Sequence, residues 1–533
     1  RGHNSTMKLI SAETARTLDA EAFASWGLDP FALVEAAGRS CAKVFTGGFP
    51  AFFSGQRPPF ITVAAGSGNN AADAMVMLRA LILEGSASVE TSLVLINRLP
   101  AQDERNPRSE AFRALAAMGV PVQVWDRPSG DAGGPAAFPR RADIIIDGIA
   151  GTGLRGPLRD AALAMVQAVN TMRNTAGSGA GQRPFVLAID VPSGNSDSWE
   201  PGMPLLEADA TLGIEPLKRA LYKPAARRFA GTILPVGGIF PAALVNRFEG
   251  TEQLCWESAR ERIPPVKPDA HKYERGVAEI RAGSPGSAGA ARIAARGAQA
   301  AGAGIVRLLV DEGIYPILAQ AAGGAMIAAN GSPADDPRRF KPDAILLGPG
   351  WGTGPDREGL LEKALEREGE GTPLILDADA IALARRRVFC GNVILTPHPG
   401  EFAAFTGLSR EHLLADPVPA LRETARQIRG TILFKGHVLY IAAPDGRLGI
   451  MDGMIPALAS GGSGDLLAGF CVALAARTAR AGIFDGYICA AAAAGLLIAA
   501  ASAPENACRF FDPPDLADTA ASLAGRAWLV ARA

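Results

Sequence analysis

The stretch Ala459-Ser460-Gly461-Gly462-Ser463-Gly464-Asp465-Leu466-Leu467-Ala468-Gly469 decides how the second half of this chain is interpreted. It is a glycine-rich turn that runs directly into an apolar helix, with one carboxylate at the junction. Backbone N–H groups of such a turn, together with the unpaired donors of the first helical turn, form an anion site suited to phosphate. Asp465 would lie beside the phosphate, where a carboxylate can take the proton of a hydroxyl that attacks phosphorus. A helix N-cap after a flexible turn is the alternative for this motif taken alone.

Four further motifs lie where apolar strands are expected to end. They are Gly348-Pro349-Gly350-Trp351-Gly352, Leu376-Asp377-Ala378-Asp379-Ala380, Thr396-Pro397-His398-Pro399-Gly400-Glu401-Phe402, and Lys435-Gly436. In open α/β sheets, ligands bind outside the carboxyl ends of the strands. His398 has the alternative of capping a rigid turn, and Lys435 that of a solvated surface lysine. The sequence lacks G-x-x-x-x-G-K-[ST], which excludes a P-loop enzyme.

In this order, the motifs from about residue 270 to the C-terminus resemble those of the ribokinase-like ADP-dependent dehydratases that repair hydrated NADH and NADPH. The resemblance implies an α/β fold and two sets of contacts. The hydrated nicotinamide nucleotide would be contacted by Ala290, Gly350, Gly352, His398 and Asp465, and the adenine nucleotide by Lys435, Gly436, His437, Val438, Leu439 and Gly464.

The same resemblance implies a reaction. ADP would phosphorylate the C6 hydroxyl of (6S)-NAD(P)HX while Asp465 acts as the catalytic base, Mg²⁺ would bridge the phosphoryl oxygens, and phosphate would then leave. Another ribokinase-like enzyme, a kinase of a vitamin-precursor alcohol, is the alternative for this half of the chain.

The first half carries its own motifs at predicted strand ends. Strands are predicted at residues 60–65, 92–96, 143–146 and 185–189, and their alternation with helical segments, such as the amphipathic pattern over residues 11–45, favours a Rossmann-like parallel sheet. Residues 66–73, 147–153 and 190–194 follow the first, third and fourth strands. Their glycines would let a diphosphate approach the backbone, and their Asn, Asp and Ser oxygens suit a hard cation or a sugar hydroxyl. Ordinary turn chemistry is the alternative for each motif singly.

These motifs resemble the NAD(P)HX epimerase domain that precedes the dehydratase in the bifunctional bacterial repair enzymes. The resemblance implies Asp190 as the acid/base at C6 and a potassium site at Asn70, Asp147 and Ser193. It implies further substrate contacts at Asn69, Asn70, Ala71, Ala72, Asp73, Gly151, Thr152, Gly153, Leu154, Arg155, Gly156, Pro157 and Asp190.

The first of these loops departs from the family pattern Gly-Asn-Asn-Gly-Gly-Asp-Gly. It reads Gly68-Asn69-Asn70-Ala71-Ala72-Asp73-Ala74. A Cβ hinders binding wherever substrate approaches the backbone closely. We therefore predict that the protein repairs the S epimer well and the R epimer poorly. A nucleotide-binding module without catalysis is the alternative for this half.

Length and composition indicate a two-domain protein. The chain has 533 residues, and we expect domains at residues 7–247 and 252–533, because prolines interrupt regular structure between residues 248 and 268. Lys plus Arg number 53 against 54 Asp plus Glu, with no long basic run, so no nucleic-acid or membrane partner is predicted. The six cysteines lack C-x-x-C spacing, which indicates no metal–thiolate site and a reduced, cytoplasmic compartment. The alanine-rich stretch 486–504 predicts a buried helix rather than a membrane span. We also expect a homo-oligomer, and a native chain that begins at Met7.

Overall fold

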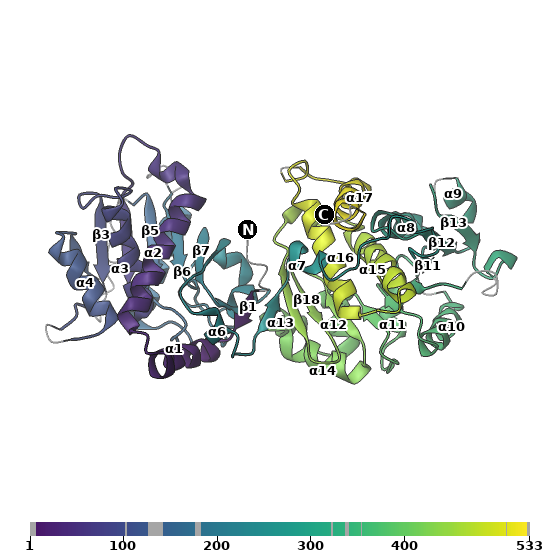
Figure 1. Cartoon of the computed structure of the whole chain (residues 1–533), viewed down its shortest axis with the longest axis horizontal. Coiled ribbons are helices and arrows are strands. Elements are labelled where there is room, and N and C mark those ends of the chain that lie inside the picture. The colour runs from purple at the N-terminus through teal and green to yellow at the C-terminus, as the bar shows by residue number, and fades with distance from the viewer. Residues whose placement is uncertain are drawn as a thin grey trace. The chain divides into compact units, whose positions relative to one another are not determined.

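The computed structural model describes residues 7–96, 98–101, 104–125, 142–175, 183–320, 323–335, 341–352, 354–507 and 509–529. Contacts within the chain divide it into two compact units, one of residues 7–251 and one that begins at Glu252. We call them the N-terminal unit and the C-terminal unit, and each is described by itself (Figure 1).

The N-terminal unit is built on a parallel sheet with the strand order β4-β3-β2-β5-β6-β7-β9. Chain order runs outward from β2 to one edge and from β5 to the other, so the direction of winding reverses between β2 and β5. Such a switch point is where doubly wound sheets bind ligands. The predicted Rossmann-like sheet is thereby confirmed. The strands are β2 (Ile61–Ala65), β3 (Ser92–Ile96), β4 (Val122–Val124), β5 (Ile144–Gly148), β6 (Phe185–Ile189), β7 (Ala210–Ile214) and β9 (Thr232–Val236), and the short β1 (Lys8–Ile10) pairs in parallel with β8 (Leu217–Lys218).

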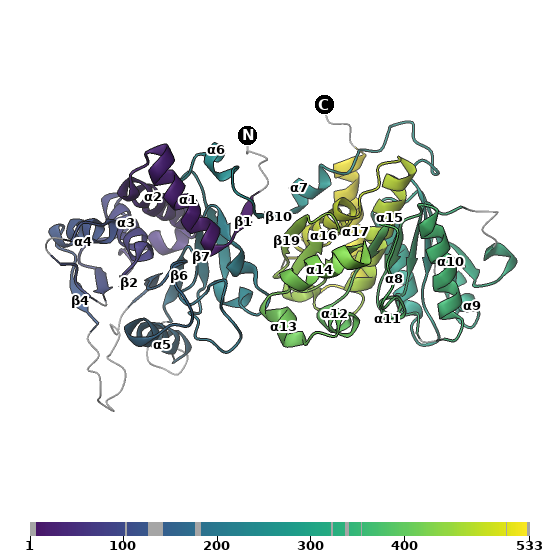
Figure 2. The same cartoon turned by 90° about the horizontal axis from the view of Figure 1, so that it is seen from below.

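Helices cover both faces of this sheet, as Figure 2 shows for α2 and α3 on one side and α5 on the other. One core joins Val34 of α2 and Met75 of α3 to the strands, and the other joins Met165 and Val169 of α5 to them. The helices are α1 (Ala12–Trp26), α2 (Pro30–Gly48), α3 (Asn69–Leu83), α4 (Pro107–Ala117), α5 (Asp160–Thr175) and α6 (Ala242–Val245), with the 3-10 turns η1 (Pro50–Phe53), η2 (Arg219–Tyr222) and η3 (Arg227–Ala230).

The amphipathic pattern over residues 11–45 forms two helices. Gly27 ends α1 in the left-handed conformation, with φ 64°, which a residue with a side chain adopts at a cost. The Asp29 side chain accepts the Ala32 N–H and Pro30 opens α2. The spacing of apolar residues in the sequence continues across this break, because both helices pack their apolar faces within the same unit. The sequence pattern therefore did not show that there are two helices.

The C-terminal unit has the strand order β13-β12-β11-β14-β15-β16-β17-β18-β19-β10. Pairing is parallel except for β17–β18 and β18–β19, and the winding reverses between β11 and β14. The strands are β10 (Thr251–Gln253), β11 (Val277–Arg281), β12 (Ile305–Val310), β13 (Met326–Ala329), β14 (Ala344–Leu347), β15 (Leu374–Leu376), β16 (Val393–Leu395), β17 (Thr431–Phe434), β18 (Val438–Ala442) and β19 (Leu448–Asp452).

Two groups of helices enclose this sheet, with α8, α15, α16 and α17 on one side and α10, α11, α12 and α14 on the other (Figure 1). The helices are α7 (Trp256–Arg260), α8 (Ala288–Ala300), α9 (Tyr315–Ala319), α10 (Arg357–Gly369), α11 (Asp379–Leu383), α12 (Pro399–Thr406), α13 (Arg410–Ala415), α14 (Val418–Ile428), α15 (Ser463–Arg480), α16 (Gly486–Ala501) and α17 (Pro513–Trp528), with the 3-10 turns η4 (Pro333–Asp335) and η5 (Pro456–Leu458).

Glycines bring α8 and α15 into close contact. A Cβ on Gly297 would lie 2.6 Å from the Leu466 carbonyl oxygen, and one on Gly469 would lie 2.2 Å from the Ala294 carbonyl oxygen. Both distances are below van der Waals contact, so only glycine allows the two backbones to approach this closely. This packing fixes the first turns of α15, where Asp465 stands.

The alanine-rich stretch forms α16, whose residues Ala490 to Ala494 are completely buried. In the part of the chain that the structure describes, no helix is both long and apolar enough to cross a membrane. The five cysteines among the described residues are free thiols.

Candidate active sites

In the C-terminal unit, the glycine-rich turn opens α15 as the sequence predicts. Gly462 is the N-cap with φ 94°, a left-handed conformation that favours glycine. Among the described residues, the N–H groups of Gly464 and Asp465 have no backbone acceptor. Two unpaired donors therefore stand at the positive end of a long helix, which is the arrangement that binds phosphate.

Lys435 lies against this turn. A Cβ on Gly464 would be 3.4 Å from its Nζ. The ammonium donates to Oδ1 of Asp377 at 2.6 Å and lies 3.9 Å from Oε2 of Glu401. Burial lowers the pKa of Lys435, but Asp377, Glu401 and Asp465 together outweigh burial and raise it. The interpretation of Lys435 as a solvated surface lysine is therefore wrong, and a fixed cation stands beside the anion site.

Asp465 is a half-buried carboxylate in the first turn of α15. Burial is the largest cause that raises its pKa to about 6, Asp377 and Glu401 raise it further, and Lys435 opposes them. A carboxylate with this pKa is mostly ionised at neutral pH, yet it is basic enough to take a proton during a reaction.

His398 caps α12. Its Nδ1 accepts the N–H groups of Gly400 at 2.9 Å and Glu401 at 3.2 Å, and the Glu401 side chain accepts the His398 N–H at 2.8 Å. The capping alternative is thus what the structure shows. Because Nδ1 is an acceptor, neutral His398 carries its proton on Nε2, which lies 3.4 Å from Oε1 of Glu401 on the exposed edge of the ring.

The loop after β14 meets the start of α8, across the point where the winding of the sheet reverses. Gly350 has φ 56°, and a Cβ there would lie 2.8 Å from Cβ of Ala290. The Gly352 N–H donates to Oδ2 of Asp379 at 2.7 Å. The structure therefore brings the predicted contacts Ala290 and Gly350 together. Of the predicted nucleotide contacts around β18, Gly436 and His437 are exposed and Val438 and Leu439 are buried.

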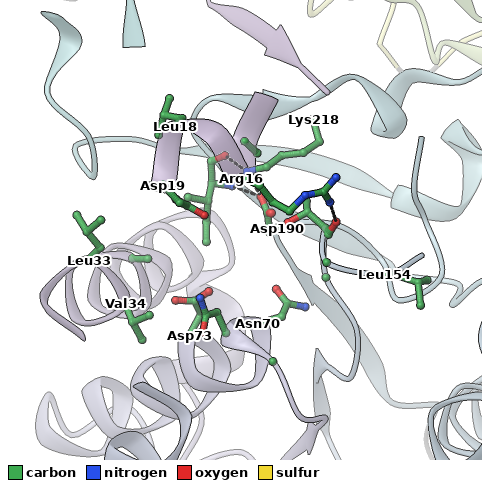
Figure 3. Close-up of a pocket in the computed structure, with 18 of the residues that line it drawn as sticks. Arg16, Leu18, Asp19, Leu33, Val34, Asn70, Asp73, Leu154, Asp190 and Lys218 are labelled. Carbon is green, nitrogen blue, oxygen red and sulfur yellow. Dashed lines mark hydrogen bonds and ion pairs between the residues drawn. The ribbon is translucent and has the colours of Figure 1, made fainter. Parts of the chain in front are cut away.

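In the N-terminal unit, a pocket of about 550 Å³ opens at the switch point between β2 and β5 (Figure 3). Predicted site residues that line it are Asn69, Asn70, Asp73, Gly151, Thr152, Gly153, Leu154, Arg155 and Asp190. Ala71, Ala72, Gly156, Pro157, Asp147 and Ser193 do not line it. Helices α1 and α2 add residues that sequence reasoning missed, among them Arg16, Leu18, Asp19, Leu33 and Val34.

The alanines that replace the family glycines are helical and face the core. Ala71, Ala72 and Ala74 are completely buried in α3, and the Ala74 methyl packs against Gly148, where a Cβ would lie 2.8 Å from it. None has positive φ. The geometry gives no support to the expectation that these methyl groups narrow the substrate space.

Asp190 follows β6 with φ 62°, a left-handed conformation that is uncommon for a residue with a side chain. Its Oδ1 accepts from Nζ of Lys218 at 2.7 Å and from the Ile214 N–H at 3.2 Å. Lys218 also donates to the Ile214 carbonyl at 3.0 Å. The sequence held no signal for Lys218, which lies in a two-residue strand 28 positions after Asp190.

Asp147 and Ser193, which are both completely buried, are hydrogen-bonded to each other. The Ser193 hydroxyl donates to Asp147 at 2.5 Å and its N–H does so at 2.8 Å. Burial is the main cause that raises the pKa of Asp147 to about 6, and hydrogen bonds from Ser193 and Ile149 oppose it. Asn70 packs against the loop at Gly151, and its amide nitrogen is buried without a partner among the described residues. A buried carboxylate without a basic partner, together with hydroxyl and amide oxygens, fits a hard cation, although the described residues hold no cluster of three His, Cys, Asp or Glu side chains.

Each of the two α/β units gathers charged side chains at the carboxyl ends of its parallel strands, which is typical of enzymes that bind nucleotides. The comparisons agree. Residues 278–521 match the family model described as NAD(P)H-hydrate dehydratase, and residues 30–220 match that of the YjeF-related protein N-terminus. The chain belongs to the family of bifunctional NAD(P)H-hydrate repair enzymes.

Relatives with that name align over most of both chains. The protein of Gloeobacter violaceus is 32% identical over 87% of this chain and 88% of its own, and that of Escherichia coli is 28% identical over 87% and 84%. Among solved structures, the ADP/ATP-dependent NAD(P)H-hydrate dehydratase of Bacillus subtilis, co-crystallised with ATP and Mg²⁺, is 27% identical over 51% of this chain and 97% of its own, with a TM-score of 0.45.

Proposed function

We propose that this protein repairs hydrated NADH and NADPH. The C-terminal unit dehydrates (6S)-NAD(P)HX at the expense of ADP, and the N-terminal unit interconverts the 6R and 6S epimers. The observation that carries the first activity is Asp465, a carboxylate with a pKa of about 6 at the open first turn of α15, beside the buried cation Lys435. The fusion of two matched family models does not favour the kinase alternative.

In the dehydration, Asp465 accepts the proton of the C6 hydroxyl as that oxygen attacks the β-phosphorus of ADP. The N–H groups of Gly464 and Asp465 and the Lys435 ammonium stabilise the negative charge of the phosphoryl group. AMP is the first product. Loss of phosphate from C6 and of a proton from C5 then restores the dihydropyridine.

A magnesium ion supplies further charge neutralisation on the phosphoryl oxygens. The nearby carboxylate Asp377 is already paired with Lys435 and accepts the Thr396 hydroxyl at 2.7 Å. We therefore infer that the ion is held mainly by the phosphate oxygens of the nucleotide, as is common for Mg²⁺.

In the epimerisation, Asp190 is the acid/base at C6, because its Oδ2 is not committed to Lys218 or Ile214. Potassium would bind at Asn70, Asp147 and Ser193 and balance the buried charge of Asp147. The substrate would lie over residues 69–73 and 151–157. A cytoplasmic location and a homo-oligomeric state stay predictions.

The direct test supplies purified protein with hydrated NADH and either ADP or ATP, and follows the return of dihydronicotinamide absorbance. We expect recovery with ADP and Mg²⁺, and much slower recovery with ATP. A second addition of enzyme after the S epimer is consumed tests the epimerase, because an enzyme-dependent second phase reports conversion of the R epimer. No recovery with either nucleotide would contradict the proposal.

A further inference from the structure

Asp73 is a largely buried carboxyl group without a hydrogen-bond or ion-pair partner among the described residues. Its side chain is 8% exposed and lines the pocket, and it makes no hydrogen bond or ion pair with any other described residue. Figure 3 shows it on α3, on the opposite side of the pocket from Asp19 and Asp190. A polar group left unpaired in a buried position costs stability. Such a group at a pocket wall is therefore expected to have its partner in the ligand.

Asp190, in contrast, has its charge compensated. Lys218 is buried beside it and donates to both Asp190 and the Ile214 carbonyl. These bonds, with the Ile214 N–H, hold Oδ1 and leave Oδ2 as the oxygen available to a ligand. Of the three carboxyl groups that line the pocket, Asp19, Asp73 and Asp190, only Asp190 forms an ion pair with a lysine or arginine among the described residues.

Several charged and titratable groups lie near Asp73 and act on its pKa. Burial raises its pKa well above the usual range, Asp190 raises it further, Lys218 lowers it and Asp19 of α1 raises it. Cys41 of α2 also lies within its electrostatic reach. Burial raises the pKa of Asp19 to about 6, with Lys218 opposing. Lys218, the one cation among the groups that shift the pKa of Asp73, is hydrogen-bonded to Asp190, so Asp73 is the carboxyl group of this pair whose protonated form is favoured by its surroundings.

We propose that Asp73 and Asp190 are the acid and the base of the epimerisation, with Lys218 as the positioning residue of Asp190; this rests on the proposed epimerase function. Many enzymes place two carboxyl groups in different environments, so that one stays protonated and acts as the acid while the other is ionised and acts as the base. The family resemblance of this loop implied only a binding role for Asp73.

The proton balance closes within the pocket. Asp190 takes the proton of the C6 hydroxyl, the C6–O bond becomes a carbonyl, and the C6–N1 bond breaks with its electron pair on N1. Asp73 gives its proton to N1. Rotation about the C5–C6 bond presents the other face of the aldehyde, and the reverse transfers close the ring as the other epimer. No oxidant or further reactant is needed.

The test uses the full chain, an equilibrated mixture of R and S epimers, and ADP. The first phase, dehydration of S by the C-terminal unit, serves as an internal control. We expect Asp73→Asn to slow the enzyme-dependent second phase at least ~100-fold and to remove the loss of rate at high pH, since no acid is left to ionise. Glu84→Gln, exposed at the end of the same helix, should change neither phase. Lys218→Met should lower kcat with little change in KM, a split that loss of packing alone would not produce, because Lys218 positions Asp190 and does not touch the substrate.

A second measurement does not depend on turnover. Isotope-edited infrared spectra at neutral pH should contain a protonated carboxyl band that Asp73→Asn removes and Glu84→Gln leaves. Absence of that band, or a second phase within ~10-fold of wild type in Asp73→Asn, would overturn the acid–base pair while leaving the epimerase function in place. A wild-type second phase that does not depend on enzyme would overturn the epimerase function itself, and the pair with it.

Discussion

Replacing Lys435 by Met removes the cation of the C-terminal site and leaves the buried Asp377 carboxylate without its ion-pair partner. The two side chains are 17% and 2% exposed and their charged atoms are 2.6 Å apart. Breaking such a buried pair costs about 3 kcal/mol or more, and in a unit of this size that lowers Tm by about 6–12 °C. Dehydration should fall about 100-fold or more, because one charged donor at the phosphoryl group is lost. Because Lys435 lowers the pKa of Asp465, the fall of rate at low pH should move above pH 6.

Thermal unfolding and the absorbance assay measure these effects. The exposed Lys363→Met is the matched control and should behave as wild type. The double variant Lys435→Met/Asp377→Asn removes both charges and should recover much of the stability but not the activity. A loss below about 1 kcal/mol in the single variant, the value expected of a solvated pair, would refute this reasoning, as would a double variant whose losses simply add.

Three further predictions concern protonation, potassium and the alanines of α3. Since Asp465 acts as a base with a raised pKa of about 6, kcat/KM for dehydration should be level at neutral pH and fall about tenfold per pH unit below about 6; a level profile down to pH 5 would contradict this. Potassium should raise the Tm of the N-terminal unit more than sodium does. The effect should be larger at pH 7.5 than at pH 5, because cation binding needs ionised Asp147, whose pKa in the cation-free protein is about 6. Asp147→Asn should abolish the difference between the two cations. Ala71→Gly and Ala74→Gly should each lower stability by about 1 kcal/mol, from helix propensity and lost packing, without speeding epimerisation; a faster second phase would show that the methyl groups do obstruct the substrate.

The parts of the fold that follow from local pattern were predictable. Buried strands such as Phe185–Ile189 and Ala344–Leu347 are visible in the sequence as short apolar runs. The turns that follow such strands carry the polar side chains of the candidate sites. The break at Gly27 was missed, because two consecutive helices with similar apolar faces give one continuous periodicity. What sequence cannot supply is contact between distant segments. Lys218 reaches Asp190 only through the pairing of a two-residue strand, and Asp19 lines the pocket only because α1 folds over it.

The alanines illustrate a second kind of limit. A family pattern tells which position has changed, but not which way the new Cβ points. Ala71 and Ala74 lie in a helix and are buried in the core. The motif alone does not show which side of the helix faces the core, so we expected their methyl groups to face the ligand. For Lys435 the motif left two interpretations, a nucleotide contact and a solvated surface lysine, and only the hydrogen bond to Asp377 excludes the second.

The most direct test of the account is Asp465→Asn in the full-length protein, measured for dehydration of the S epimer and for ADP binding by calorimetry. The amide preserves the shape of the first turn of α15 but cannot accept the proton. We predict a loss of at least ~100-fold in rate, with the ADP dissociation constant within about threefold of wild type and the stability unchanged or slightly raised, since the pKa of about 6 shows that ionised Asp465 is disfavoured by burial. A variant that keeps more than about a tenth of the wild-type rate would show that Asp465 is not the base.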